Sequence, residues 1–243
     1  MTGHSARWRI GTSGWQYRHW KGVFYPADLK QAEWFAWYAR HFDTVEINNT
    51  FYGLPQAETF DAWRERAPEG FCYTLKFSRF GTHVKRLKDP AASIAVFLDA
   101  AERLGGLLGP ILVQLPPRFE VDAGRLAAFL DAAPARRRWA VEFRHPTWLC
   151  EEVYAVLRGH NAALCIHDLL PDHPRLVTAD WVYLRFHGAG PQGSYSPQAL
   201  TAVAGRVRRH VAAGRDVYVY FNNDQHGYAV RNALALRRYV DGP

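Results

Sequence analysis

Long apolar runs are missing from this 243-residue sequence. No uninterrupted apolar stretch approaches the roughly 18 residues that a membrane-spanning helix needs. The strand-like segment at residues 8–11 begins too early to leave room for a secretory signal peptide. These absences predict a soluble, cytoplasmic protein with no membrane partner.

Cysteine and the common cofactor motifs are also scarce. The three cysteines, Cys72, Cys150 and Cys165, are odd in number and have no CxxC spacing, which argues against a disulfide framework or a structural zinc site. No GxGxxG or Walker-type loop is present, so we expect no nucleotide cofactor. No HExxH or HxH spacing indicates a metal site.

What is present is apolar and basic. Hydrophobic residues make up 48% of the chain and aromatic residues 14%, enough for one large core, so we predict a single domain over residues 1–243. The net charge of +7 favours anionic partners. Many basic residues lie on expected outer helix faces rather than in one stripe, so nucleic-acid binding stays an alternative.

Strand-like and helix-like patterns alternate along the whole chain. Predicted strands cover residues 8–12, 44–48, 71–77, 110–115, 139–148, 162–167, 181–187 and 217–221. Amphipathic stretches between them predict about seven helices. Eight such units in this length predict an α/β fold, a single (β/α)8 TIM barrel. Helix six should be shortened or missing, because the segment between residues 167 and 181 is short and contains proline.

Polar side chains stand at the C-terminal ends of these apolar runs. Burying an unpaired charge costs several kcal/mol, so their repetition indicates that the strand ends meet around a shared polar site. In a TIM barrel the active site lies at this end, here called the mouth. The residues expected there are Glu46, Lys76, Gln114, Glu142, Arg144, His145, His167, Asp168, Arg185, His187 and Asp224.

These side chains suggest acid-base chemistry on an anionic ligand. We predict Glu142 as general base, His187 as acid, Lys76 near a developing negative charge, and Glu46 as a fourth catalytic residue. Arg144 and Arg185 would hold an anionic group. The other predicted substrate-binding residues are Asn48, Gln114, His145, Trp15, Tyr17, Tyr52, Asn222 and Asn223.

Two other interpretations of the mouth stay open. A divalent metal would find donors in Glu142, His167, Asp168 and His187, although the neighbouring arginines oppose it. In the other interpretation, these side chains satisfy one another as ion pairs and bind no ligand.

Seven short segments, in order along the chain, resemble those of the YecE-like family of uncharacterised proteins. They are GTSGW at 11–15, TVEIN at 44–48 with TFY at 50–52, TH at 82–83, QLPP at 114–117, VEFRH at 141–145, RFHG at 185–188 and YFNN at 220–223. The resemblance covers essentially the whole chain and implies a TIM barrel. It implies no particular activity.

From the residues we therefore expect an enzyme, which would be a hydrolase, a lyase or an isomerase. Its substrate would be a small anion, a phosphorylated or nucleotide-derived sugar, processed by acid-base or metal-assisted chemistry. One alternative is a protein that binds nucleic acid or processes its ends. Another is a non-catalytic barrel that binds a ligand or acts as a scaffold.

Overall fold

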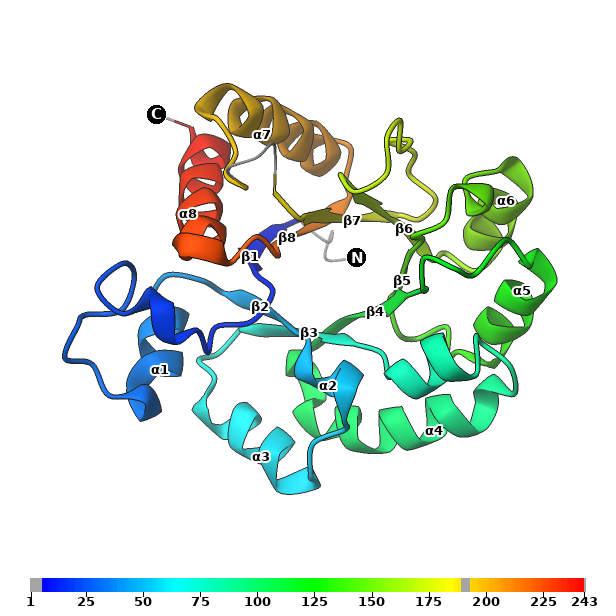
Figure 1. The fold of residues 1–243 in the computed structure, drawn as a ribbon, viewed down its shortest axis with the longest axis horizontal. Helices are drawn as coiled ribbons and strands as arrows, with labels where there is room; N and C mark the ends of the chain where they lie inside the picture. Colours follow the sequence, from blue (N-terminus) through cyan, green and yellow to red (C-terminus); the bar gives the residue numbers. More distant parts are fainter. Residues whose placement is uncertain (1–5, 189–192, 243) are drawn as a thin grey trace, which may run out of the picture.

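The computed structural model describes residues 6–188 and 193–242, and its eight strands form one parallel barrel (Figure 1). The strands pair in the order β1-β8-β7-β6-β5-β4-β3-β2. They are β1 Trp8–Thr12, β2 Thr44–Ile47, β3 Cys72–Lys76, β4 Leu108–Gln114, β5 Trp139–Glu142, β6 Ala163–His167, β7 Trp181–Phe186 and β8 Asp216–Phe221. The predicted TIM-barrel fold is confirmed.

Helices surround the strands, and most follow a strand directly (Figure 1). The α-helices are α1 Trp34–Ala39, α2 Asn49–Tyr52, α3 Ala57–Arg66, α4 Pro90–Ala101, α5 Ala123–Ala132, α6 Glu151–Gly159, α7 Pro197–Ala212 and α8 Tyr228–Asp241. Between β6 and β7, residues 168–180 contain no helix. The predicted loss of a helix there is confirmed, and it leaves part of the barrel wall without the usual cover.

The barrel closes where β1 meets β2. The Gly14 N–H donates to Glu46 O at 2.8 Å, and Ser13 forms a single bridge with Glu46. At Gly11 an added Cβ would lie 2.4 Å from the Thr44 carbonyl oxygen, so only glycine permits this approach. The closure sets Ser13 and Glu46 side by side at the mouth.

Strand alternation separates two buried layers. Apolar side chains on the outer faces of the strands pack beneath the helices in one large core. Inside the barrel, a second cluster includes Leu112, Trp181, Tyr183 and Tyr220. The Tyr220 hydroxyl lies 2.7 Å from the hydroxyls of both Thr44 and Thr74, which ties three strands together below the mouth.

Short helical turns accompany the α-helices in the segments that follow β1 and β3. Before β2, a 3-10 turn, η2 Gln31–Glu33, is followed by the short α1. The segment after β3 contains a π-helical turn, η3 Phe80–Val84. Among the described residues, no helix combines the length and apolar character needed to cross a membrane.

Candidate functional site

Arg185, at the end of β7, lies between two buried carboxylates. Its Nη2 donates to Glu46 Oε1 at 2.7 Å and its Nη1 donates to Glu142 Oε2 at 2.6 Å. All three side chains are at most 1% exposed. The parallel register makes this possible because β2, β5 and β7 place their alternate side chains at the same height inside the barrel.

Two hydroxyl groups complete the hydrogen bonding of the Glu46 carboxylate. Ser13 Oγ donates to Oε1 at 2.6 Å and the Tyr183 hydroxyl donates to Oε2 at 2.5 Å. With Arg185, they give this buried carboxylate the charge-assisted partners that it needs. Glu46 is therefore fully engaged inside the protein.

Glu142 is held in a similar way. Arg144 donates to its Oε1, and the Cys165 thiol lies 3.6 Å from its Oε2. Burial alone would raise the pKa of Glu142, but Arg185, His187 and Arg144 together outweigh burial and hold that pKa well below its usual range. Burial and the Glu142 charge raise the pKa of Cys165, so the thiol stays protonated.

Lys76, at the end of β3, differs from these paired groups. It is 8% exposed, and its Nζ lies 4.2 Å from the centre of the Phe51 ring. Within residues 6–188 and 193–242, no carboxylate approaches Nζ within 4 Å. Burial, followed by the positive charge of Arg185, lowers the pKa of Lys76 to about 8. The ammonium group is therefore free to meet a ligand.

His83 belongs to the π-helical turn η3 and lies beside Lys76. Its ring meets the edge of Phe51 with the centroids 4.9 Å apart, and its Nδ1 lies 2.9 Å from Thr82 Oγ1. Because Thr82 donates its only hydroxyl hydrogen to Ser78 O, we assign the hydrogen of this contact to His83 Nδ1. This tautomer leaves Nε2 as an acceptor.

Burial and nearby cations keep His83 neutral. Burial, followed by Lys76, lowers its pKa to about 4. His83 was not among the predicted site residues because it follows no strand-like run. A π-helical insertion often marks a functional site, but no sequence pattern predicted this one.

His187 stands next to Glu142 at the end of β7. Its buried Nε2 has no hydrogen-bond partner among the described residues and lies 3.8 Å from Glu142 Oε2. Its Nδ1 lies 3.2 Å from Asn222 Nδ2, and Asn48 Nδ2 donates to Asn222 Oδ1 at 3.4 Å. The three side chains form a polar chain along one wall of the mouth.

Gln114 belongs to the same mouth, because its Oε1 accepts from Arg144 Nη2 at 3.4 Å. The remaining predicted polar residues have structural contacts outside the Arg185 network. His145 caps a short turn through Thr147, and Asn223 Nδ2 donates to Asn232 Oδ1 at 3.0 Å. Asp168 accepts the His187 N–H at 3.0 Å.

The predicted aromatic residues do not form a shared stacking surface. Trp15 is 6% exposed and packs edge-on against Phe35 and Trp63. The Tyr17 hydroxyl donates to Ser13 O at 2.6 Å, whereas Tyr52 is 79% exposed. Stacking on unpaired bases would need several exposed rings close together.

The proposed metal donors do not form a ligand set. The two ring nitrogens of His167 contact Phe143 O at 2.8 Å and the Leu169 N–H at 3.2 Å. Glu142 is paired with arginines, which oppose a divalent ion. In the part of the chain that the structure describes, no three His, Cys, Asp or Glu side chains come together as a potential metal site. We therefore derive no step through a metal.

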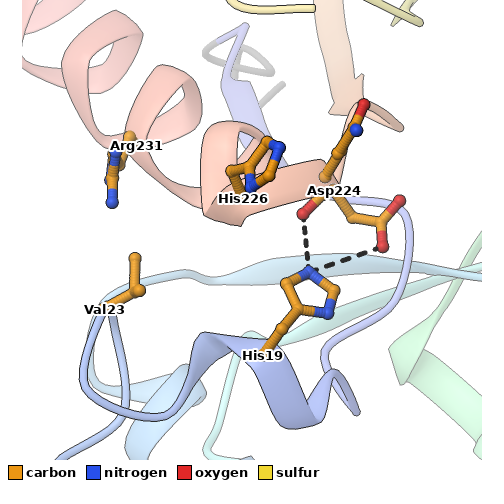
Figure 2. A pocket seen from close by; sticks show the side chains of 6 residues that line it. His19, Val23, Asp224, His226 and Arg231 are labelled. Atoms are coloured by element: carbon orange, nitrogen blue, oxygen red, sulfur yellow. Dashed lines mark hydrogen bonds and ion pairs between the residues drawn. The ribbon is translucent and has the colours of Figure 1, made fainter.

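A separate hollow of about 670 Å³ lies beside the segment that follows β8 (Figure 2). His19 Nε2 lies 2.7 Å from Asp224 O and 3.8 Å from Asp224 Oδ2. His226 and Arg231 also line this hollow. Asp224 was expected in the mouth, and the structure pairs it with His19 instead.

The fold and the mouth define a class: a TIM barrel whose C-terminal end carries a buried Glu-Arg-Glu network beside a free lysine. Residues 9–242 match the family described as "Protein of unknown function DUF72", and the chain belongs to that family. The expected YecE-like resemblance is thereby confirmed.

Three relatives illustrate the match. The UPF0759 protein YecE of Escherichia coli is 35% identical over 127 residues, which are 50% of this chain and 46% of YecE, so the aligned part spans less than half of that relative. The UPF0759 protein YunF of Bacillus subtilis is 24% identical over 276 residues, covering 96% of this chain and 94% of YunF. The crystal structure of a DUF72 family protein from Thermotoga maritima superposes with a TM-score of 0.82 at 29% identity, covering 97% of this chain and 99% of that one.

Proposed function

We propose that this protein is an enzyme that binds a small anionic substrate at the barrel mouth and processes it by acid-base chemistry. The observation that carries the proposal is Lys76, a nearly buried ammonium with a lowered pKa and no carboxylate partner among the described residues. Burying a cation without a counter-ion raises the free energy of the folded state, and such groups concentrate at functional sites.

The charge balance of the mouth supports an anionic substrate. The described part of the mouth contains three cations, Lys76, Arg144 and Arg185, and the two buried carboxylates Glu46 and Glu142. Arg185 is already paired with both carboxylates, whereas the Arg144 side chain is 22% exposed. Lys76 and Arg144 would therefore hold a phosphate or carboxylate group, and Arg185 would keep the network rigid.

The same residues provide proton transfer. With a pKa of about 8, Lys76 is mostly protonated at neutral pH and gives up its proton far more easily than an ordinary lysine. His83, which also packs against Phe51, offers a neutral acceptor in its Nε2. In this geometry, Glu142 acts through the arginines and His187 as a positioning residue.

The wall of the mouth that carries amide side chains is suited to the hydroxyl groups of a sugar. Asn48, Asn222 and Gln114 carry the donors and acceptors that recognise hydroxyl groups. A phosphorylated or nucleotide-derived sugar combines such hydroxyls with an anionic group. We therefore propose this substrate class.

The test uses inorganic phosphate as the probe in isothermal titration calorimetry. Lys76→Met should weaken phosphate binding at least tenfold, because it removes the free ammonium of the mouth. The variant should also be as stable as the wild type or up to about 3 kcal/mol more stable, because a lysine whose pKa is lowered by folding opposes folding.

Lys88→Met is the matched control, since Lys88 is exposed and lies outside the network. It should leave phosphate affinity unchanged. Equal affinity of the wild type and Lys76→Met for phosphate would contradict the proposed function.

A further inference from the structure

The missing helix leaves a second cavity on the outside of the barrel. Figure 1 shows the yellow-green connection from β6 to β7 as a loop, where other units of the barrel carry a helix. A cavity of about 690 Å³ lies between this loop, the outer faces of β6 and β7, and α7. Its volume falls within the range of about 300–1,000 Å³ that is usual for small-molecule sites.

Part of the cavity wall is apolar because it consists of strand side chains that face out of the barrel. Strand alternation directs Tyr183 and Arg185 into the barrel, so Leu184 and Phe186 face outward. In a complete barrel unit a helix would cover these side chains. Here they face Val203 of α7 across the cavity.

The rest of the wall carries unpaired positive charge. Arg206 of α7 and Arg175 of the loop both line the cavity. Among residues 6–188 and 193–242, neither guanidinium has a carboxylate within 4 Å. Burial, followed by the charges of Arg175 and Arg209, lowers the pKa of Arg206. Two neighbouring cations without a counter-ion repel each other unless an anion lies between them.

The acidic residues of the cavity do not neutralise this pair. Asp168 accepts hydrogen bonds from the His187 N–H and the Tyr195 hydroxyl. Asp172 is exposed, and it forms no ion pair within the described part of the chain. His210 also lines the cavity, and burial and nearby arginines lower its pKa, so at neutral pH it is uncharged and neither adds to nor neutralises the positive charge.

We propose that this cavity is a second binding site, separate from the mouth, for an amphipathic organic anion. The anionic group lies between Arg175 and Arg206, and the apolar body rests on Leu184, Phe186 and Val203. The wall is only partly apolar, which fits a small molecule better than the apolar face of a partner helix.

Octanoate is the probe, with octanamide as its uncharged equivalent. We expect calorimetry to show octanoate binding to the wild type at least tenfold more tightly than octanamide. Arg206→Gln should weaken octanoate binding at least tenfold, because it removes one of the two charges that hold the carboxylate. Arg175→Gln, on the exposed loop, should do the same with little risk to folding.

Two control variants make the result specific. Arg209→Gln changes an exposed arginine of the same helix that does not line the cavity, and it should change octanoate affinity less than twofold. Lys76→Met should leave octanoate affinity unchanged while it weakens phosphate binding at the mouth at least tenfold.

The proposal is overturned if octanoate fails to bind, or if octanamide binds equally well. It is also overturned if octanoate affinity falls with Lys76→Met instead of Arg206→Gln, since the anion would then occupy the mouth. Loss of phosphate binding at the mouth does not bear on this cavity, so the two proposals fail separately.

Discussion

Arg185→Leu is expected to lower the free energy of unfolding by about 3–5 kcal/mol at pH 7. The substitution leaves Glu46 and Glu142 buried and fully shielded from water without their shared cation. Removing one partner from a buried ion pair has a cost of this size because an uncompensated charge remains in the interior. Urea denaturation followed by tryptophan fluorescence measures the effect.

The pH dependence should change sign in this variant. In the wild type the pKa of Glu142 is depressed, so its contribution is present above the unfolded pKa near 4.5 and is lost as pH falls through the folded pKa. Without Arg185, burial raises the carboxyl pKa, and stability should increase as pH falls from 7 toward 5.

Arg231→Leu provides the control for these measurements. Arg231 is exposed beside the hollow shown in Figure 2, so stability should change by less than about 0.5 kcal/mol. If Arg185→Leu were as stable as Arg231→Leu, Arg185 would not be the centre of the network.

Glu142→Gln should have the second largest effect on stability, a loss of about 2–4 kcal/mol. It leaves Arg144 and Arg185 facing a neutral amide, so Glu46 alone balances them. The mouth also becomes more positive, so phosphate affinity should stay equal or increase. Urea denaturation and phosphate calorimetry on the same samples separate these effects.

Glu120→Gln removes an exposed glutamate outside the mouth and should change neither quantity. A Glu142→Gln protein with wild-type stability and weaker phosphate binding would contradict the positioning role. It would indicate that Glu142 contacts the ligand directly.

The sequence predicted the barrel well because strand-forming and helix-forming periods alternate clearly. It also predicted that Glu46, Glu142 and Arg185 share the mouth, since charges at the ends of parallel strands must meet there. The residues 168–180 were correctly expected to lack a full helix, because a short proline-containing segment cannot form one.

Contacts that depend on loop conformation could not be predicted. Asp168 and His145 follow strand-like runs, but their loops turn them toward local backbone and hydroxyl partners. His83 reaches the mouth only because a π-helical turn places it against Phe51. That Arg175 and Arg206 line one cavity depends equally on the conformation of the irregular loop between β6 and β7.

The most direct test of the account is an NMR titration of the Lys76 side chain in protein carrying ¹³C-labelled lysine. The chain has only five lysines, so Lys76→Met identifies its signal by loss. The account predicts a pKa of about 8 in the free protein and a higher pKa when inorganic phosphate binds, because the anion stabilises the ammonium. A pKa near the ordinary 10.5 that phosphate does not change would contradict it.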